Sequence, residues 1–126
     1  MSISVKRMKK LLKDDYQIID IRSAAEIAHG EIPGAVIVAS ENVLDNKKID
    51  YSKKLIICCA RGEISEETAR LLKSEGYDAQ SLEGGFGAWL LDKMSMTDEN
   101  EKAFEVEKSH RKKFRKELWS KFTKAV

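Results

Sequence analysis

The stretch from Leu55 to Ser65 constrains the fold more than any other part of this 126-residue chain. Three apolar residues lead into the adjacent cysteines Cys58 and Cys59, a short loop with Gly62 follows, and a helical pattern begins at Ser65. This order predicts a strand, a tight loop and a helix. Because the loop amides and the positive end of the helix dipole converge where the sulfur lies, the stretch also predicts a reactive thiolate.

The sequence on either side repeats the same alternation. Apolar runs at 17–21, 35–39 and 79–82 predict further strands. Helical patterns are expected at 65–75, with Ala69, Leu71 and Leu72 facing inward, and around Trp89 after the turn at 84–85. Strands that alternate with helices predict an α/β domain with a mainly parallel central sheet flanked by helices. Ligand sites in such sheets lie at the carboxyl ends of the strands, where the Cys59 loop falls.

Composition narrows the class of protein. Hydrophobic residues make up 42% of the chain, which is typical of a globular domain, and its apolar runs are far below the ~18 residues of a membrane span. No secretory signal is visible, and the only two cysteines are adjacent, so we expect reduced thiols in the cytoplasm rather than a disulfide framework. The two histidines, His29 and His110, lack metal-ligand spacing, so no metal and no cofactor is expected.

Charge divides the chain into two parts. Residues 101–126 hold nine Lys and Arg against four Asp and Glu, a net charge of +5, whereas residues 1–100 hold 14 basic and 17 acidic groups, a net charge of −3. We therefore expect a domain over 1–93, a polar linker over 94–102 and a basic amphipathic helix over 103–126. Phe114, Leu118 and Phe122 recur at i, i+4 spacing on that helix.

Three ordered signatures resemble the rhodanese-like sulfurtransferases. The first is Ile18-Ile-Asp-Ile-Arg22, followed by Glu26 and by Gly30-Glu-Ile-Pro-Gly-Ala35. The second is Cys59 with Gly62, Ser65 and Ala69 behind it, and the third is Glu83-Gly-Gly-Phe-Gly-Ala-Trp89. The resemblance covers roughly residues 3–92, and it implies a rhodanese-like fold.

The resemblance also implies the chemistry. Cys59 would be the catalytic nucleophile that takes a sulfane sulfur from thiosulfate or a persulfide-bearing protein and passes it to an acceptor thiol or partner protein. The anion-binding loop would be formed by residues Ala60, Arg61, Gly62, Glu63, Ile64 and Ser65. Cys58 is the competing nucleophile, but side chains alternate along a strand, so it should point into the core.

Two loop positions bear on the substrate. Members of the family often have a basic residue where this chain has Ile64. The absence of that positive charge favours a persulfide donor over thiosulfate. Arg61 could supply the charge from another position, or it is a solvated loop residue. Related phosphatases need an arginine six residues after the cysteine, where this chain has Ser65. Without that arginine, phosphoryl transfer is not expected.

The basic segment resembles the lead-in helix of ATP-pyrophosphatase-type tRNA thiolation enzymes over about 20 residues. That resemblance implies a tRNA-thiolation protein as the sulfur acceptor. Other interpretations of 103–126 are self-association through the apolar face, or RNA contact through the basic faces. The alternative to an enzyme is a non-catalytic module that keeps the fold and binds a partner through this helix.

Overall fold

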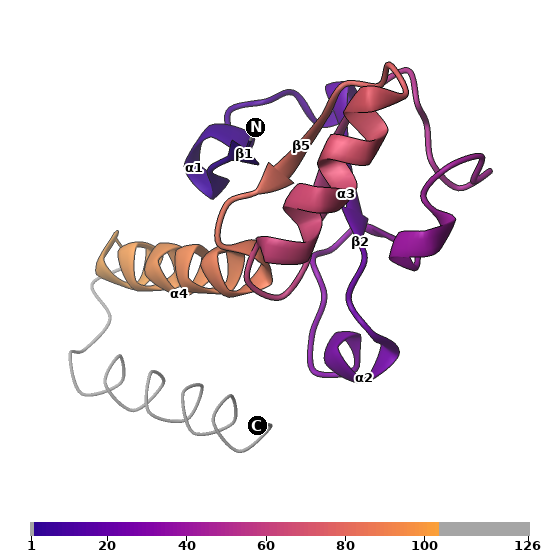
Figure 1. The fold of residues 1–126 in the computed structure, drawn as a ribbon. Coiled ribbons are helices and arrows are strands. Elements are labelled where there is room, and N and C mark those ends of the chain that lie inside the picture. The colour runs from indigo at the N-terminus through magenta and orange to yellow at the C-terminus, as the bar shows by residue number, and fades with distance from the viewer. Residues whose placement is uncertain (1, 104–126) are drawn as a thin grey trace. The chain divides into compact units, whose positions relative to one another are not determined.

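The computed structural model describes residues 2–103, so the basic helix expected at 103–126 lies outside the described residues beyond Ala103. Figure 1 shows the fold. Within the described residues, one sheet has the strand order β1-β5-β4-β2-β3, and every neighbouring pair is parallel. The strands are β1 (Ser2–Ile3), β2 (Tyr16–Asp20), β3 (Val36–Ile37), β4 (Lys54–Cys58) and β5 (Ala79–Leu82). The predicted α/β fold with a parallel sheet is confirmed, although the two-residue strand β1 is too short to have been recognised from periodicity.

Four α-helices lie in the described residues: α1 (Val5–Met8), α2 (Ala24–Ile27), α3 (Glu63–Ser74) and α4 (Gly85–Ala103). The residues expected to form a linker, 94–102, are helical as part of α4. Polarity alone does not end a helix, and the chain has no Gly or Pro between Ala88 and Ala103 to interrupt it. None of the helices in 2–103 has the length and apolarity that crossing a bilayer requires.

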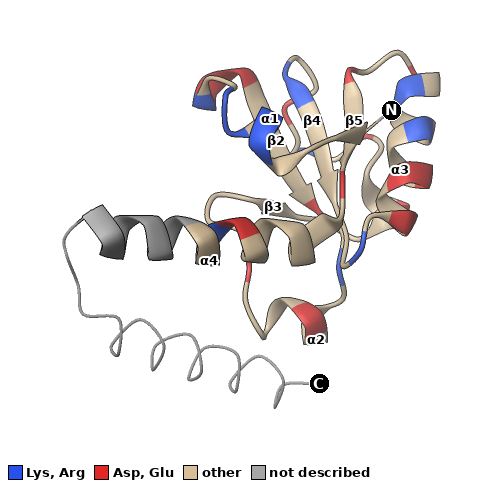
Figure 2. Cartoon of the chain, turned by 90° about the vertical axis from the view of Figure 1, so that its left-hand side faces the viewer, with Lys and Arg blue, Asp and Glu red and all other residues tan. Residues whose placement is uncertain are grey.

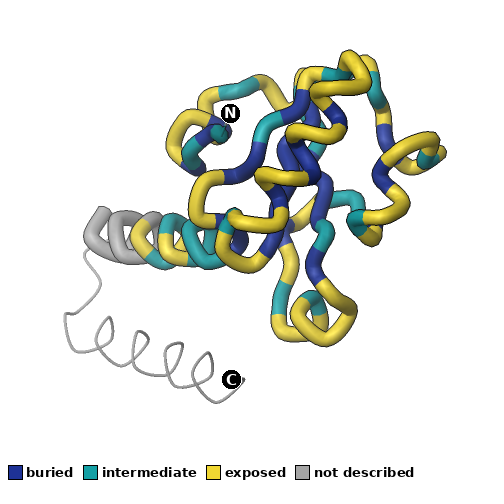
Figure 3. Tube along the Cα trace, in the orientation of Figure 1, coloured by how far each residue is buried: buried dark blue, intermediate teal, exposed yellow. Residues whose placement is uncertain are grey.

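The central strand β4 supplies side chains to both faces of the sheet and is fully buried from residue 55 to residue 58 (Figure 3). Leu55 and Ile57 pack on one face, in a cluster that includes residues of α3. Ile56 and Cys58 pack on the other face, in a cluster that includes residues of α1. This alternation determines on which face of the sheet the side chain of each residue at the end of β4 packs.

Helix α3 contacts the sheet through a narrow stripe. Ala69 and Leu72 are fully buried, as predicted, but the inward orientation predicted for Leu71 is wrong, because its side chain is 43% exposed. Since each residue advances about 100° around a helix, Leu71 lies beside the buried stripe rather than within it.

A buried ion pair ties the end of β2 to the segments that follow it. The Arg22 guanidinium lies 2.8 Å from the Asp20 carboxylate and also donates to the Gly30 carbonyl oxygen at 2.8 Å. The guanidinium carbon lies 3.9 Å from the centre of the Phe86 ring. Burial lowers the pKa of Arg22, but the hydrogen bond and the charge of Asp20 outweigh it, so the pKa is raised above its ordinary value. These contacts connect the end of β2 with Gly30 and with Phe86 at the start of α4.

Candidate active site

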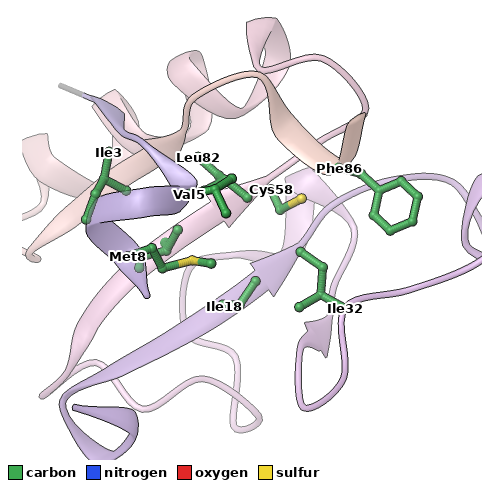
Figure 4. Close-up of a cluster of buried hydrophobic side chains, with 9 residues drawn as sticks. Ile3, Val5, Met8, Ile18, Ile32, Cys58, Leu82 and Phe86 are labelled. Carbon is green, nitrogen blue, oxygen red and sulfur yellow. The ribbon is translucent and has the colours of Figure 1, made fainter. Parts of the chain in front are cut away.

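The two cysteines at the end of β4 have opposite environments. Cys58 is fully buried, and its side chain belongs to the apolar cluster that includes Val5, Leu82 and Phe86 (Figure 4). Burial raises the pKa of Cys58 to about 12, with the nearby Asp20 carboxylate contributing in the same direction. A thiol with such a pKa is protonated at neutral pH. The prediction that Cys58 serves the core is therefore confirmed.

Cys59 directly follows the last residue of β4 at the carboxyl edge of the sheet, where the loop to α3 begins. Its sulfur accepts hydrogen bonds from the backbone N–H of Gly62 at 3.0 Å and from that of Ser65 at 3.4 Å. The Ser65 hydroxyl oxygen lies 3.3 Å from the same sulfur. The backbone can fold back on the sulfur because Gly62 adopts φ 101°, a conformation that side chains disfavour. Loop amides and the first turn of α3 therefore converge on one sulfur atom.

These contacts set the ionisation of Cys59. Burial alone would raise its pKa, but hydrogen bonds from the Ser65 side chain and from the backbone of Ser65, Gly62 and Arg61 lower the pKa below the ordinary value of a thiol. The N-terminus of α3 adds a positive potential in the same place. Cys59 is thus the more readily ionised of the two thiols, as nucleophilic chemistry requires.

The turn at the start of α4 is hydrogen-bonded to the Cys59 loop. The first N–H groups of α4 donate to its carbonyl oxygens: Phe86 to Cys59 at 2.8 Å and Gly87 to Ala60 at 3.3 Å. Gly85 permits this close approach, because a Cβ atom built there would lie 2.8 Å from the carbonyl carbon and oxygen of Ala60. The turn predicted at 84–85 therefore positions the candidate nucleophile.

The structure places the other predicted loop residues at the rim of the site. Ala60, Arg61, Glu63 and Ile64 are exposed, and Ile64 is 61% exposed in the first turn of α3. Arg61 contributes its backbone to Cys59, and its side chain lies in solvent. Among the side chains that the structure describes, no group of three or more from His, Cys, Asp or Glu is arranged to hold a metal ion.

Sequence reasoning missed one residue behind the site. Ser81 on β5 is 1% exposed, and its hydroxyl oxygen lies 2.6 Å from that of Ser65. A signal was present in the sequence, because Ser81 lies in the predicted strand 79–82 and shares a face with Ala79, two positions before it. A hydroxyl at such a position needs a buried partner.

Three features occur together in this structure: a parallel α/β sheet, a cysteine of lowered pKa at its carboxyl edge, and backbone N–H groups that donate to the sulfur. This combination is typical of the class of proteins that react through a covalent cysteine intermediate. The sequence profile of the Rhodanese-like domain matches residues 4–92. The chain therefore belongs to the rhodanese-like sulfurtransferase family, as the three signatures predicted.

Named relatives agree with this family. The thiosulfate sulfurtransferase GlpE of Pseudoalteromonas translucida is 33% identical over 90 residues, which cover 69% of this chain and 86% of that protein. GlpE of Shewanella oneidensis is 36% identical over 75 residues, or 58% of this chain and 74% of that protein. Among solved structures, a rhodanese-like domain protein from Staphylococcus aureus is similar with a TM-score of 0.61 and 35% identity, covering 70% of this chain and 89% of that one.

Proposed function

We propose that this chain carries a sulfane sulfur as a persulfide on Cys59 and passes it to an acceptor thiol. The observation that supports this proposal most directly is the set of hydrogen bonds at the Cys59 sulfur. The backbone N–H groups of Gly62 and Ser65 donate to it, and the Ser65 hydroxyl, which accepts from the thiol, can donate to the thiolate. The same donors that stabilise a thiolate also stabilise the terminal sulfur of a persulfide anion, which is charged and close to the same place.

The chemistry proceeds in two balanced steps. The Cys59 thiolate attacks the sulfane sulfur of the donor, the sulfur–sulfur bond of the donor breaks, and its remaining part leaves with the electron pair as a thiolate or, from thiosulfate, as sulfite. The acceptor thiolate then attacks the terminal sulfur on Cys59 and restores the Cys59 thiolate. No external oxidant or reductant is needed, because the sulfane sulfur moves at one oxidation level.

The test is intact mass after incubation with thiosulfate and, separately, with a low-molecular-weight persulfide. Wild-type protein should gain the mass of one sulfur atom, and fragmentation should place it on Cys59 rather than on its neighbour. Addition of an acceptor thiol should then remove it. Absence of sulfur gain from either donor would contradict the proposal and favour a binding module that has only the fold.

The rim of the site supports a persulfide donor over thiosulfate. Ile64 leaves a hydrophobic side chain where a cation would attract a dianion. The acidic residues Glu63, Glu66 and Glu67 lie at the N-terminal turns of α3 (Figure 2), and Arg61 is the exposed cation in the preceding loop. A local excess of negative charge disfavours the approach of thiosulfate, which carries two negative charges.

Replacing Ile64 with arginine should therefore improve the use of thiosulfate. One positive charge about 7 Å from a dianion in water contributes about 1 kcal/mol, so kcat/KM for thiosulfate should rise roughly fivefold at low ionic strength and return toward wild type in high salt. The matched control is Leu71→Arg, which adds the same charge to an exposed position on α3, two turns further from the loop. An equal gain in both variants, or none in Ile64→Arg, would contradict this proposal about the donor.

The acceptor we propose is a thiol or a protein of tRNA thiolation. This part of the proposal is supported by the basic composition of 101–126 and by its resemblance to the lead-in helix of tRNA thiolation enzymes. A cytoplasmic location suits such an acceptor and the two free cysteines. Salt-dependent tRNA binding by the full chain, lost on deletion of 101–126, would favour direct RNA contact through that segment, whereas a concentration-dependent mass would favour self-association.

A further inference from the structure

Behind Cys59 lies a buried chain of hydroxyl groups. Ser65 Oγ lies 3.3 Å from the Cys59 sulfur and 2.6 Å from Ser81 Oγ. Each hydroxyl oxygen also lies within hydrogen-bonding distance of the carbonyl oxygen of Gly62, Ser65 at 3.1 Å and Ser81 at 3.4 Å. Ser65 is fully buried and Ser81 is 1% exposed, so these groups satisfy one another rather than water.

The sheet fixes the place of Ser81. It pairs with Ile57 in the register of β4 and β5, and Ile57 belongs to the core cluster that includes Ala69 and Leu72 of α3. Ser81 therefore faces α3, in a core that is mainly apolar. A hydroxyl at such a position costs free energy of desolvation unless it is hydrogen-bonded.

Counting protons shows what the second hydroxyl adds. In the thiol state, the Cys59 S–H donates to Ser65 Oγ and the Ser65 proton points to the Gly62 carbonyl oxygen. In the thiolate state, the Ser65 proton must turn to the sulfur. That rotation leaves the Gly62 carbonyl oxygen without its Ser65 donor. Ser65 Oγ also no longer accepts a hydrogen bond from the Cys59 S–H, so it needs another donor. Ser81, within reach of both oxygens, is placed to donate to either one.

We propose that Ser81 is a positioning residue for the Cys59 sulfur. Its hydroxyl donates a hydrogen bond to Ser65 Oγ or to the Gly62 carbonyl oxygen in the thiolate state, so that the Ser65 proton is free to turn toward the sulfur. A hydrogen bond donated to Ser65 Oγ also polarises the Ser65 O–H and strengthens the bond that it donates in turn. The same arrangement serves the anionic persulfide, so the inference rests on the proposed function for its biological role. The ionisation of Cys59 tests it without any sulfur transfer.

The experiment measures the pH dependence of Cys59 alkylation by iodoacetamide in the folded, full-length protein. In Ser65→Ala the midpoint should rise by about one to two pH units, because a hydrogen bond to a charged group is lost. In Ser81→Ala it should rise by roughly a third of a unit, equivalent to about a twofold smaller thiolate fraction below the midpoint. Ser81→Thr, which keeps the hydroxyl, should restore the wild-type midpoint, and Ser74→Ala, which removes an exposed hydroxyl at the far end of α3, should leave it unchanged.

Other charges cannot produce this pattern. The titratable and charged groups on the segments around Cys59 are identical in every variant: Asp20 and Arg22 at the end of β2, Cys58 on β4, Arg61 in the loop, Glu63, Glu66 and Glu67 on α3, and Glu83 before α4. The sharpest comparison is the double variant Ser65→Ala/Ser81→Ala. Because Ser81 acts through Ser65, its effect should vanish in the Ser65→Ala background.

Two results would overturn the inference. One is a Ser81→Ala midpoint equal to that of wild type, and the other is an effect of Ser81→Ala that persists in full when Ser65 is already alanine. A purely structural Ser81 would change the melting temperature without moving the midpoint. If alkylation behaves as expected but no donor loads sulfur, the proposed function fails while the positioning of the thiolate stands.

Discussion

Cys59→Ser should fail to gain sulfur from any donor, whereas Cys58→Ala should load as wild type does. A serine hydroxyl in the same cradle of amides stays protonated at neutral pH, so the rate of loading should fall by at least about three orders of magnitude. Cys58 cannot replace it, because the Cys58 thiol is fully buried on the opposite face of the sheet and its pKa is raised to about 12. Intact mass after timed incubation with a persulfide donor measures both variants.

Alanine is the appropriate control at position 58 because it adds no unsatisfied hydroxyl to the apolar cluster around Ile18 and Leu82. It should cost about 1 kcal/mol of unfolding free energy for the small cavity left by the sulfur. Sulfur gain that persists in Cys59→Ser and is lost in Cys58→Ala would reverse the assignment of the two thiols. Loss in both would show instead that the adjacent cysteines act as a pair.

The position of Cys59 could be predicted because the relevant signals are local. An apolar run gives the strand, alternation along it separates the two cysteines, and Gly62 indicates a tight loop. The prediction of where the helix begins was less accurate. Ser65 was expected to begin it, but α3 begins at Glu63, because Gly62 in the left-handed conformation already turns the chain into the helix. The Ser65 side chain is thereby turned toward the Cys59 sulfur.

The remainder of the site depends on contacts between segments that are distant in the sequence. The pattern around Gly85 predicts a turn, but nothing local says that this turn approaches the backbone of Ala60. The hydroxyl of Ser81 likewise meets that of Ser65 only because β5 pairs with β4 in one particular register. Leu71 shows the same limit on α3, because small differences in helix rotation decide whether a residue beside the buried stripe is covered.

The contact of Gly85 with the Cys59 loop predicts a large effect from a single methyl group. In Gly85→Ala, the new Cβ meets the carbonyl group of Ala60 and the carbonyl oxygen of Cys59, which are backbone atoms and cannot rotate away. Residue 85 also has φ 61°, which an alanine adopts only with strain. The unfolding free energy should fall by about 2–4 kcal/mol. The rate of sulfur loading should fall roughly a hundredfold, since a displacement of about 1 Å misplaces the nucleophile and its donors.

Gly76→Ala separates the two causes. Gly76 also has a positive φ of 93°, but a Cβ there meets nothing within 4 Å, so only the backbone strain remains. It should cost about 1 kcal/mol of unfolding free energy and leave sulfur loading unchanged. Loading is measured well below the melting temperature of each variant, with the folded fraction followed by circular dichroism. Wild-type loading by folded Gly85→Ala would show that the Cys59 loop keeps its geometry without the support of α4, and equal losses in both variants would assign the effect to backbone strain alone.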